Sequence, residues 1–211
     1  MADYARAASA AAGVLLSGRA GDGGVATDVL RLIGDAPNTR LICYSRAAFR
    51  LCVPPLEFAR RYAESAVSYA KLDPRTGVYY IFYNDMSLLR RDERAHLAHE
   101  FAHALLGHTR GGGNNDEENE ANCCARLLMC PAPVADALRL DGVRQYMDAF
   151  DVNAELAGAA VWFRDRDREA FARCAPGLLD RYADRVGITS GKLSRLRRAS
   201  GGSWLDVWGE Q

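Results

Sequence analysis

The pattern of apolar and polar residues predicts a mostly helical chain with two short strands. In the strands, β-branched and aromatic residues follow one another. These stretches are Arg40 to Tyr44 and Val78 to Tyr83. Elsewhere in the first half, apolar residues recur every three or four positions, a spacing that places them on one face of a helix. This spacing predicts helices over residues 3–17, 27–33 and 56–69.

The second half of the chain has helical spacing throughout. Ser87 is a candidate N-cap for a helix from about Leu88 to Leu106, and Gly107 ends it. A second long helix, Asp116 to Met129, is followed by prolines. Alternating arginine and acid from Arg164 to Glu169 is typical of a solvated surface or a linker. Shorter helices are predicted over residues 132–139, 142–149, 153–163, 168–174, 177–186 and 190–199. We therefore expect an α+β fold, with a small antiparallel sheet beside the helix that ends at Leu106.

Length and composition favour one main domain. A chain of 211 residues, of which 49% are apolar, can build a sizeable core. We expect an N-terminal helix and glycine-rich loop over residues 1–24, a main domain over 25–150 and a helical segment over 151–211. The formal net charge is +0, so no overall field attracts nucleic acid or an anionic membrane. No stretch approaches the ~18–20 apolar residues of a membrane span.

The cysteines and the N-terminus favour a cytoplasmic protein. The six cysteines follow no spacing of a small secreted scaffold, so we expect reduced thiols that mostly fill the core. A signal peptide is the alternative interpretation of the apolar run Ala8 to Leu16. Asp3 precedes that run, however, and the run is short and rich in alanine, which favours a helix.

The strongest chemical signal is the stretch from His99 to His103, His-Glu-Phe-Ala-His. Two histidines four residues apart lie on one helix face, so both imidazoles can bind one metal ion. Glu100 projects about 100° from His99 around the helix, too far to be a ligand but near enough to hold a metal-bound water. We predict that His99 and His103 bind a catalytic Zn²⁺ and that Glu100 is the general base. Manganese and iron are the alternative ions.

A catalytic zinc needs a third protein ligand. Leu106 and Thr109 stand where one class of zinc peptidases has a glycine and a third histidine, so that class is excluded. His108 would lie roughly 180° from His99 around a continuous helix. We therefore expect His108 and His96 to be surface residues or neighbours of the ligands.

The third ligand is expected from the acidic stretch 116–122. Glu118 is preferred because the small Ala121 lets the two helices approach, and Asn122 lies four residues on, on the same face. Asn122 can then hydrogen-bond a ligand histidine and hold its tautomer. Glu120 is about 200° from Glu118 and is expected to face solvent. Glu117 is the fallback ligand.

Two further stretches have a pattern suited to a partner. The strand Tyr79 to Tyr83 is either a sheet edge that aligns an extended peptide or an ordinary core strand. Residues 177–199 resemble a helix-turn-helix with basic residues on its second helix, which would allow DNA binding. An ordinary helical hairpin with a basic face is the favoured interpretation of that stretch.

Three blocks of sequence, in this order, resemble the ImmA/IrrE family of zinc metallopeptidases. They are Tyr80 to Asp85, Arg94 to His108 and Glu118 to Pro131, within about residues 25–150. The resemblance implies a mainly helical, zincin-like fold of the gluzincin type. It implies zinc ligands at His99, His103 and Glu118, and a general base at Glu100. The chain departs from the family at Cys124, where an aromatic residue is usual, and at Cys130, which interrupts the usual Leu-Met-Pro.

The resemblance also implies a biological role. Members of this family are bacterial, phage or mobile-element proteins that typically cleave helix-turn-helix repressors, some beside a repressor-like antitoxin. Our first hypothesis is therefore a cytoplasmic zinc endopeptidase that cleaves such a repressor. The second is a peptidase-like protein that sequesters a repressor without cutting it, or contacts DNA through its C-terminal helices.

Overall fold

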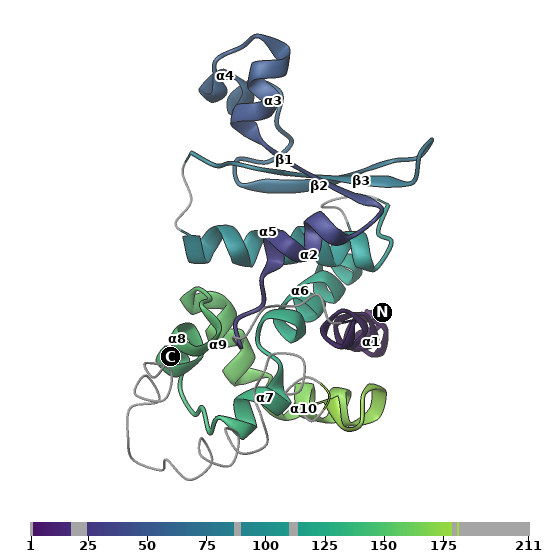
Figure 1. The fold of residues 1–211 in the computed structure, drawn as a ribbon, viewed down its shortest axis with the longest axis vertical. Helices are drawn as coiled ribbons and strands as arrows, with labels where there is room; N and C mark the ends of the chain where they lie inside the picture. The colour runs from purple at the N-terminus through teal and green to yellow at the C-terminus, as the bar shows by residue number, and fades with distance from the viewer. Residues whose placement is uncertain (1, 18–24, 87–89, 110–113, 179–180, 182–211) are drawn as a thin grey trace.

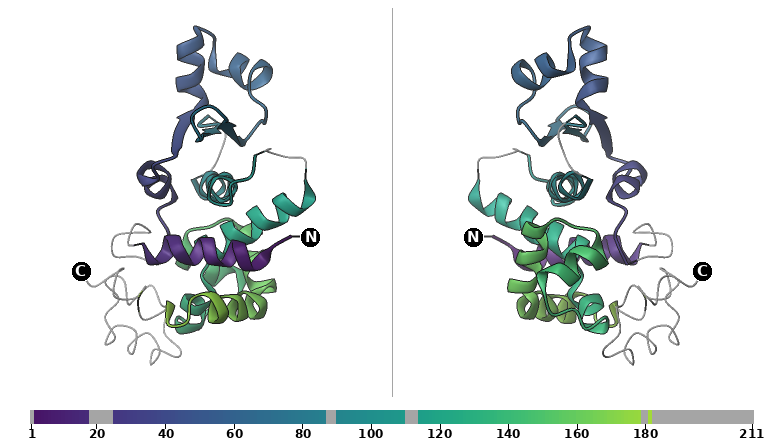
Figure 2. Two further views of the ribbon diagram at one scale, coloured as in Figure 1. Left: turned by 90° about the vertical axis from the view of Figure 1, so that its right-hand side faces the viewer. Right: turned by 90° about the vertical axis from the view of Figure 1, so that its left-hand side faces the viewer.

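The computed structural model describes residues 2–17, 25–86, 90–109, 114–178 and 181. Its layers are arranged around the long helix α5 (Arg90–Leu105), which has a sheet on one side and a group of helices on the other (Figures 1 and 2). The helices below α5 in Figure 1 are α1 (Tyr4–Leu16), α6 (Asn115–Met129), α7 (Ala132–Ala137), α8 (Val143–Phe150), α9 (Ala154–Trp162) and α10 (Arg164–Cys174). The predicted mixture of helices and a small sheet is confirmed.

The sheet has three strands in the order β1-β3-β2, and it is mixed. Strand β2 (Ser68–Asp73) pairs antiparallel with β3 (Val78–Tyr83), whereas β1 (Thr39–Cys43) pairs parallel with β3. The prediction of an antiparallel sheet is therefore wrong for β1, because the chain crosses over through two helices and β2 before it reaches β3. Those helices, α3 (Tyr44–Leu51) and α4 (Pro55–Arg61), lie on the face of the sheet away from α5 (Figure 1).

The presence of strand β2 contradicts two predictions, one about the helix over residues 56–69 and one about the role of Tyr79 to Tyr83. The helix predicted over residues 56–69 ends at Arg61, and Ser68 to Asp73 form a strand in place of its last turn. In addition, β3 has a partner on both sides, so it cannot be the edge that aligns a peptide. Among the described residues, β2 is an edge strand of the sheet, it contacts α5, and its Ser68 and Ala70 are buried.

Helix α1 belongs to the main core. Its buried face consists of four alanines and one leucine, and the small alanines allow close packing against α6 and α10. These residues, each at most 3% exposed, are Ala7, Ala8, Ala11, Ala12 and Leu15. Helix α2 (Val29–Asp35) packs against α5 and β1. The predicted boundaries at residues 24 and 150 stay predictions, but both α1 and α10 contribute side chains to the same core cluster.

Residues 164–169 are not a linker, because they form the first half of α10. Four of these six residues are exposed, as expected for a solvated surface, but Asp167 is not. Asp167 is buried there and accepts hydrogen bonds of 2.7 and 2.8 Å from Arg126 on α6. Arg164 and Arg168 pair with Asp136 on α7. The alternating charges therefore join three helices.

The structure also bears on the predictions about the cysteines, membrane spans and the C-terminal stretch. All six cysteines are free; Cys123, Cys124 and Cys130 are buried, whereas Cys52 and Cys174 are exposed. Among the described residues, no helix is both long and apolar enough to cross a membrane. The predicted N-cap Ser87 and almost all of the helix-turn-helix-like stretch 177–199 lie outside the described residues.

Candidate metal centre

Helices α5 and α6 pack against each other and carry the three predicted ligands. His99 and His103 lie one turn apart on α5, and Glu118 lies in the first turn of α6. The side chain of Asn114 caps α6 by accepting a hydrogen bond from the Asp116 amide. A carboxylate in a first turn is favoured by the positive end of the helix dipole, so the local sequence supports this position of Glu118.

The two imidazoles and the carboxylate converge at distances that suit a metal ion. Nε2 of His99 is 3.1 Å from Nε2 of His103 and 3.2 Å from Oε2 of Glu118. Nε2 of His103 is 3.5 Å from Oε1 of Glu118. Ligands bound at ~2.0–2.1 Å to a tetrahedral zinc are about 3.3 Å apart. His99, His103 and Glu118 together could therefore hold a metal ion, as predicted.

A buried chain of hydrogen bonds, the relay, runs from Glu120 through His108 to His103. It determines which nitrogen of His103 can bind a metal ion. Nε2 of His108 is 3.1 Å from Oε2 of Glu120, and Nδ1 of His108 is 2.9 Å from Nδ1 of His103. Since a carboxylate accepts, His108 donates through Nε2 and accepts through Nδ1. His103 must then donate through Nδ1, which leaves the lone pair of its Nε2 directed at His99 and Glu118. This is the tautomer that metal binding requires.

The expectation that Glu120 faces solvent is wrong, and so is the placing of His108 on the far side of the helix. The helix is not continuous beyond Leu105, because Gly107 adopts a left-handed conformation with φ of +65°. The Gly107 amide donates to Ala104 and the His108 amide donates to His103, the two bonds of a Schellman motif. This turn brings the His108 ring back to His103, as a neighbour of the ligands.

Helix α1 holds the outer end of the relay. The Asp3 amide donates to Oε1 of Glu120 at 2.6 Å, and the guanidinium of Arg6 lies 3.6 Å from Oε2 of Glu120. Arg6 also donates to the Leu106 carbonyl at the end of α5. The hydroxyl of Tyr79 on β3 donates to the His108 carbonyl. Residues far apart in the sequence thus hold both Glu120 and His108 in place.

The environment keeps both ligand imidazoles neutral. Burial lowers the pKa of His103 to about 3, with smaller contributions from His99 and His108. Burial also lowers the pKa of His99, against the opposing effect of Glu118. Asn122 lines the same cavity as His99, on the helix that carries Glu118, and its contact with a ligand histidine stays a prediction. Neutral imidazoles have free lone pairs at neutral pH, as metal ligation requires.

Glu100 is buried beside the ligands and is not one of them. Its Oε1 accepts a hydrogen bond of 3.0 Å from the hydroxyl of Ser68 on β2. Burial raises the pKa of Glu100 to about 7, although Ser68 and the Ala70 backbone stabilise the charged form. A carboxyl with this pKa can both accept and deliver a proton at neutral pH. Sequence reasoning missed Ser68, because β2 itself was predicted as the end of a helix.

No protein-family model, no curated protein and no solved structure matches this chain. The interpretation of the site therefore depends on its geometry and on the chemistry of its side chains.

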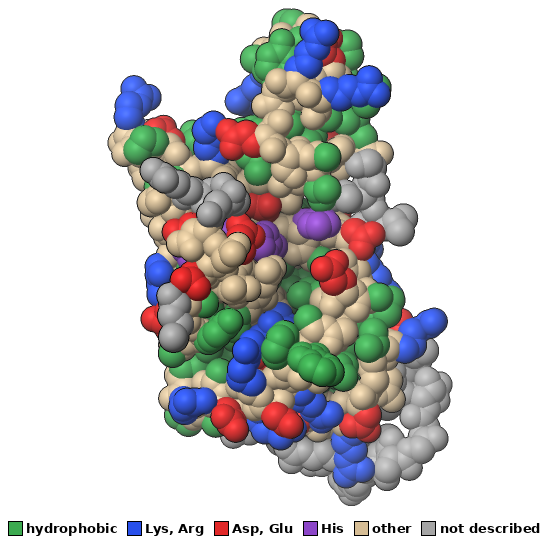
Figure 3. All heavy atoms as spheres, turned by 180° about the vertical axis from the view of Figure 1, so that it is seen from behind, with side chains coloured by type: hydrophobic (Ala, Val, Ile, Leu, Met, Phe, Trp, Pro, Cys, Tyr) green, Lys and Arg blue, Asp and Glu red, His purple; other side chains and the backbone are tan. Residues whose placement is uncertain are grey.

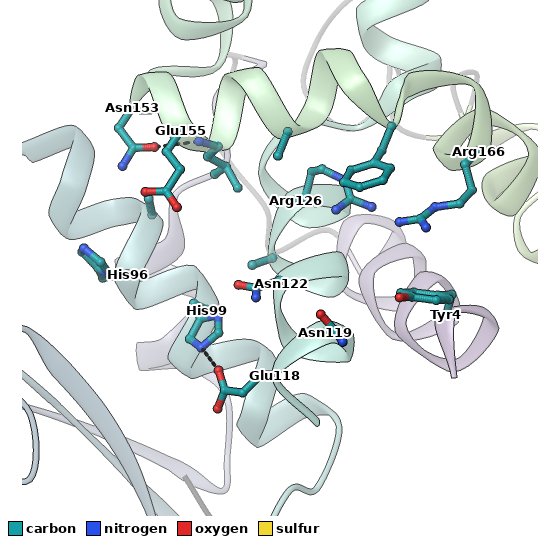
Figure 4. A pocket seen from close by; sticks show the side chains of 15 residues that line it. Tyr4, His96, His99, Glu118, Asn119, Asn122, Arg126, Asn153, Glu155 and Arg166 are labelled. Carbon is teal, nitrogen blue, oxygen red and sulfur yellow. Dashed lines mark hydrogen bonds and ion pairs between the residues drawn. The ribbon is translucent and has the colours of Figure 1, made fainter. Parts of the chain in front are cut away.

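Two of the three ligands, His99 and Glu118, line a cavity of about 540 Å³. Seen from behind, histidine side chains lie between the upper and lower parts of the molecule, with acidic side chains beside them (Figure 3). His99 and Glu118 point toward each other at one end of the cavity, and Arg126, Arg166 and Tyr4 lie toward the other (Figure 4). His96 also lines the cavity, so it borders the site. A cavity of this size suits a short peptide segment better than a single small ion.

Proposed function

We propose that this protein is a cytoplasmic zinc endopeptidase of the ImmA/IrrE type, and that its substrate is a helix-turn-helix repressor. The observation that carries the proposal is the convergence of His99, His103 and Glu118 within 3.1–3.5 Å, next to the buried carboxyl of Glu100. Two imidazoles and one carboxylate are a ligand set typical of catalytic zinc. Free cysteines suit a reducing compartment.

The residues have distinct roles in the proposed hydrolysis. When bound, the ion would act as a Lewis acid that lowers the pKa of a water toward ~7 and polarises the scissile carbonyl. Glu100 accepts a proton from the attacking water and delivers it to the leaving nitrogen. Ser68 orients Glu100 for both transfers. His108 and Glu120 keep the Nε2 lone pair of His103 directed at the ion.

Strand β2 offers a place for the substrate. It is an edge strand, and its Ser68 contacts the proposed general base. An extended peptide that pairs with the free edge of β2 would therefore run beside Glu100. This replaces β3, which the sequence analysis considered for that role.

The test is a comparison of wild-type protein with Glu100→Gln, both loaded with zinc and incubated with the helix-turn-helix protein encoded nearest to this gene. We expect one zinc per chain in both proteins, cleavage by wild type and a loss of at least about a hundredfold in cleavage rate in Glu100→Gln. Glu118→Gln should lose both zinc and cleavage.

Two results would contradict the proposal. Wild-type protein that binds no zinc, with its histidines free, would remove the metal centre. Zinc-loaded protein that binds the repressor but produces no fragment would favour the non-cleaving, sequestering function instead.

A further inference from the structure

The cavity beside the metal ligands extends along α6, away from Glu118. Its floor includes Asn119, Asn122 and Arg126 of that helix. From Glu118 to Arg126 the helix rises about 12 Å, at 1.5 Å per residue. An extended peptide covers this distance in about three to four residues. A substrate held at the metal could therefore place a nearby side chain, or its own end, at the far end of the cavity.

That far end is built around the guanidinium of Arg166. The guanidinium carbon lies 4.2 Å from the ring centre of Phe163 and 4.5 Å from the ring centre of Tyr4. Tyr4 belongs to α1, whereas Phe163 and Arg166 belong to the junction of α9 and α10. Two aromatic rings thus position an arginine fork at the cavity wall.

The charge of Arg166 is available to a ligand. Among the described residues, no carboxylate forms an ion pair with Arg166. The neighbouring Arg126 also contacts Phe163, with its guanidinium carbon 4.6 Å from the ring centre. The charge of Arg126, however, is already compensated by the two carboxylate oxygens of Asp167. The cavity is therefore polarised, with the carboxylate of the ligand Glu118 at one end and an uncompensated cation at the opposite end (Figure 4).

We propose that this end of the cavity is a carboxylate-binding subsite, in which Arg166 pairs with an acidic group of the substrate about three to four residues from the scissile bond. Asn119 and Asn122, which lie between Glu118 and the two arginines, supply neutral amides along the path (Figure 4). The inference rests on the proposed peptidase function. The acidic group is either an Asp or Glu side chain or a chain-terminal carboxylate, since both present the same planar pair of oxygens to the guanidinium.

The probes are tripeptides and tetrapeptides that carry a hydroxamate at one end as the zinc-binding group, prepared in both chain directions. One set has a glutamate at each position in turn and an amide at the other end. A second set has glutamine and a free terminal carboxylate, and a neutral set has glutamine and an amide. Affinity for zinc-loaded protein is measured by calorimetry. We expect an acidic probe of one set to bind about fivefold more tightly than its neutral counterpart, and the set that does so identifies the source of the carboxylate.

The variant Arg166→Gln should lose this preference and bind the neutral probes as wild type does. Arg173→Gln is the matched control, since Arg173 lies on the same helix, is exposed and pairs with Glu169 outside the cavity. Arg173→Gln should retain the preference. Equal affinity of acidic and neutral probes at every position, in protein that binds zinc, would overturn the subsite and leave the metal centre intact. Protein that binds no zinc would overturn the proposed function and the subsite with it.

Discussion

At the scale of single residues, the relay from Glu120 through His108 to His103 makes a testable claim about metal affinity. His108→Ala removes the acceptor for Nδ1 of His103, so both tautomers of His103 become accessible. We expect zinc affinity to fall about 10–100-fold, the usual effect of losing a residue that supports a ligand. Glu120→Gln keeps a hydrogen-bonding group but not the charge, so its loss should be smaller. Competition with a chromophoric zinc chelator measures both.

The control for that experiment is His96→Ala. His96 lies on α5 one turn before His99, and among the described residues no hydrogen bond joins it to His103 or Glu120. It should bind zinc as wild type does. Unchanged affinity in His108→Ala would show that the relay does not orient the ligand.

Glu100 predicts a pH dependence of stability in the metal-free protein. Folding raises its pKa from 4.5 to about 7, so the folded state binds this proton more strongly than the unfolded chain. The stabilising contribution is complete below about pH 4.5 and is lost as the pH rises through about 7. In Glu100→Gln this loss is absent. We expect the variant to gain of the order of 3 kcal/mol over wild type between pH 4.5 and pH 8, because each pKa unit is worth about 1.4 kcal/mol.

Urea unfolding in the presence of a chelator measures this difference. The imidazoles of His99 and His103 titrate in both proteins, so their contributions largely cancel in the comparison. Parallel stability curves for the two proteins over this range would contradict a raised pKa for Glu100.

At the scale of elements, the alanine-rich face of α1 determines how closely this helix approaches its neighbours. Ala8 is fully buried, whereas Ala5 is exposed on the same helix. Ala8→Leu should destabilise the protein by about 1–3 kcal/mol through overpacking, and Ala5→Leu should be nearly neutral. Because Asp3 and Arg6 of this region hold Glu120, Ala8→Leu should also weaken zinc binding. Thermal unfolding and chelator competition on both variants test the two effects; equal behaviour of the variants would contradict them.

At the scale of the whole molecule, the ion pair between Arg126 and Asp167 joins the ligand-bearing helix α6 to α10. Both side chains are almost fully buried, at 4% and 3% exposure. Asp167→Ala leaves a buried guanidinium without its counter-charge, which should cost about 3–5 kcal/mol. Asp165→Ala is the control, because Asp165 is 88% exposed. Denaturant unfolding of the two variants should differ by this amount, and similar stabilities would mean that the buried pair is dispensable.

The success of sequence reasoning varied with the range of the interactions involved. The strand Val78 to Tyr83, the helix of the ligand histidines and the helix of Glu118 follow from local periodicity, and all three are present. Strand β2 was missed because its residues have little strand preference of their own and adopt the strand by pairing with β3. At the charged start of α10, the sequence did not reveal that Asp167 is buried, because the arginine that it neutralises, Arg126, lies 41 residues away from it in the chain.

For the site, the sequence alone determined the two histidines, the adjacent glutamate and the preferred third ligand, because helical spacing places them on defined faces. Only the tertiary structure decided that Glu118 meets both imidazoles, since that depends on the packing of α6 on α5. It also decided the relay through His108 and Glu120, the contact of Ser68 with Glu100 and the exposed charge of Arg166 in the cavity. All of these features depend on residues that a turn or the packing of two elements brings together. The periodicity within a single helix or strand does not encode such proximity.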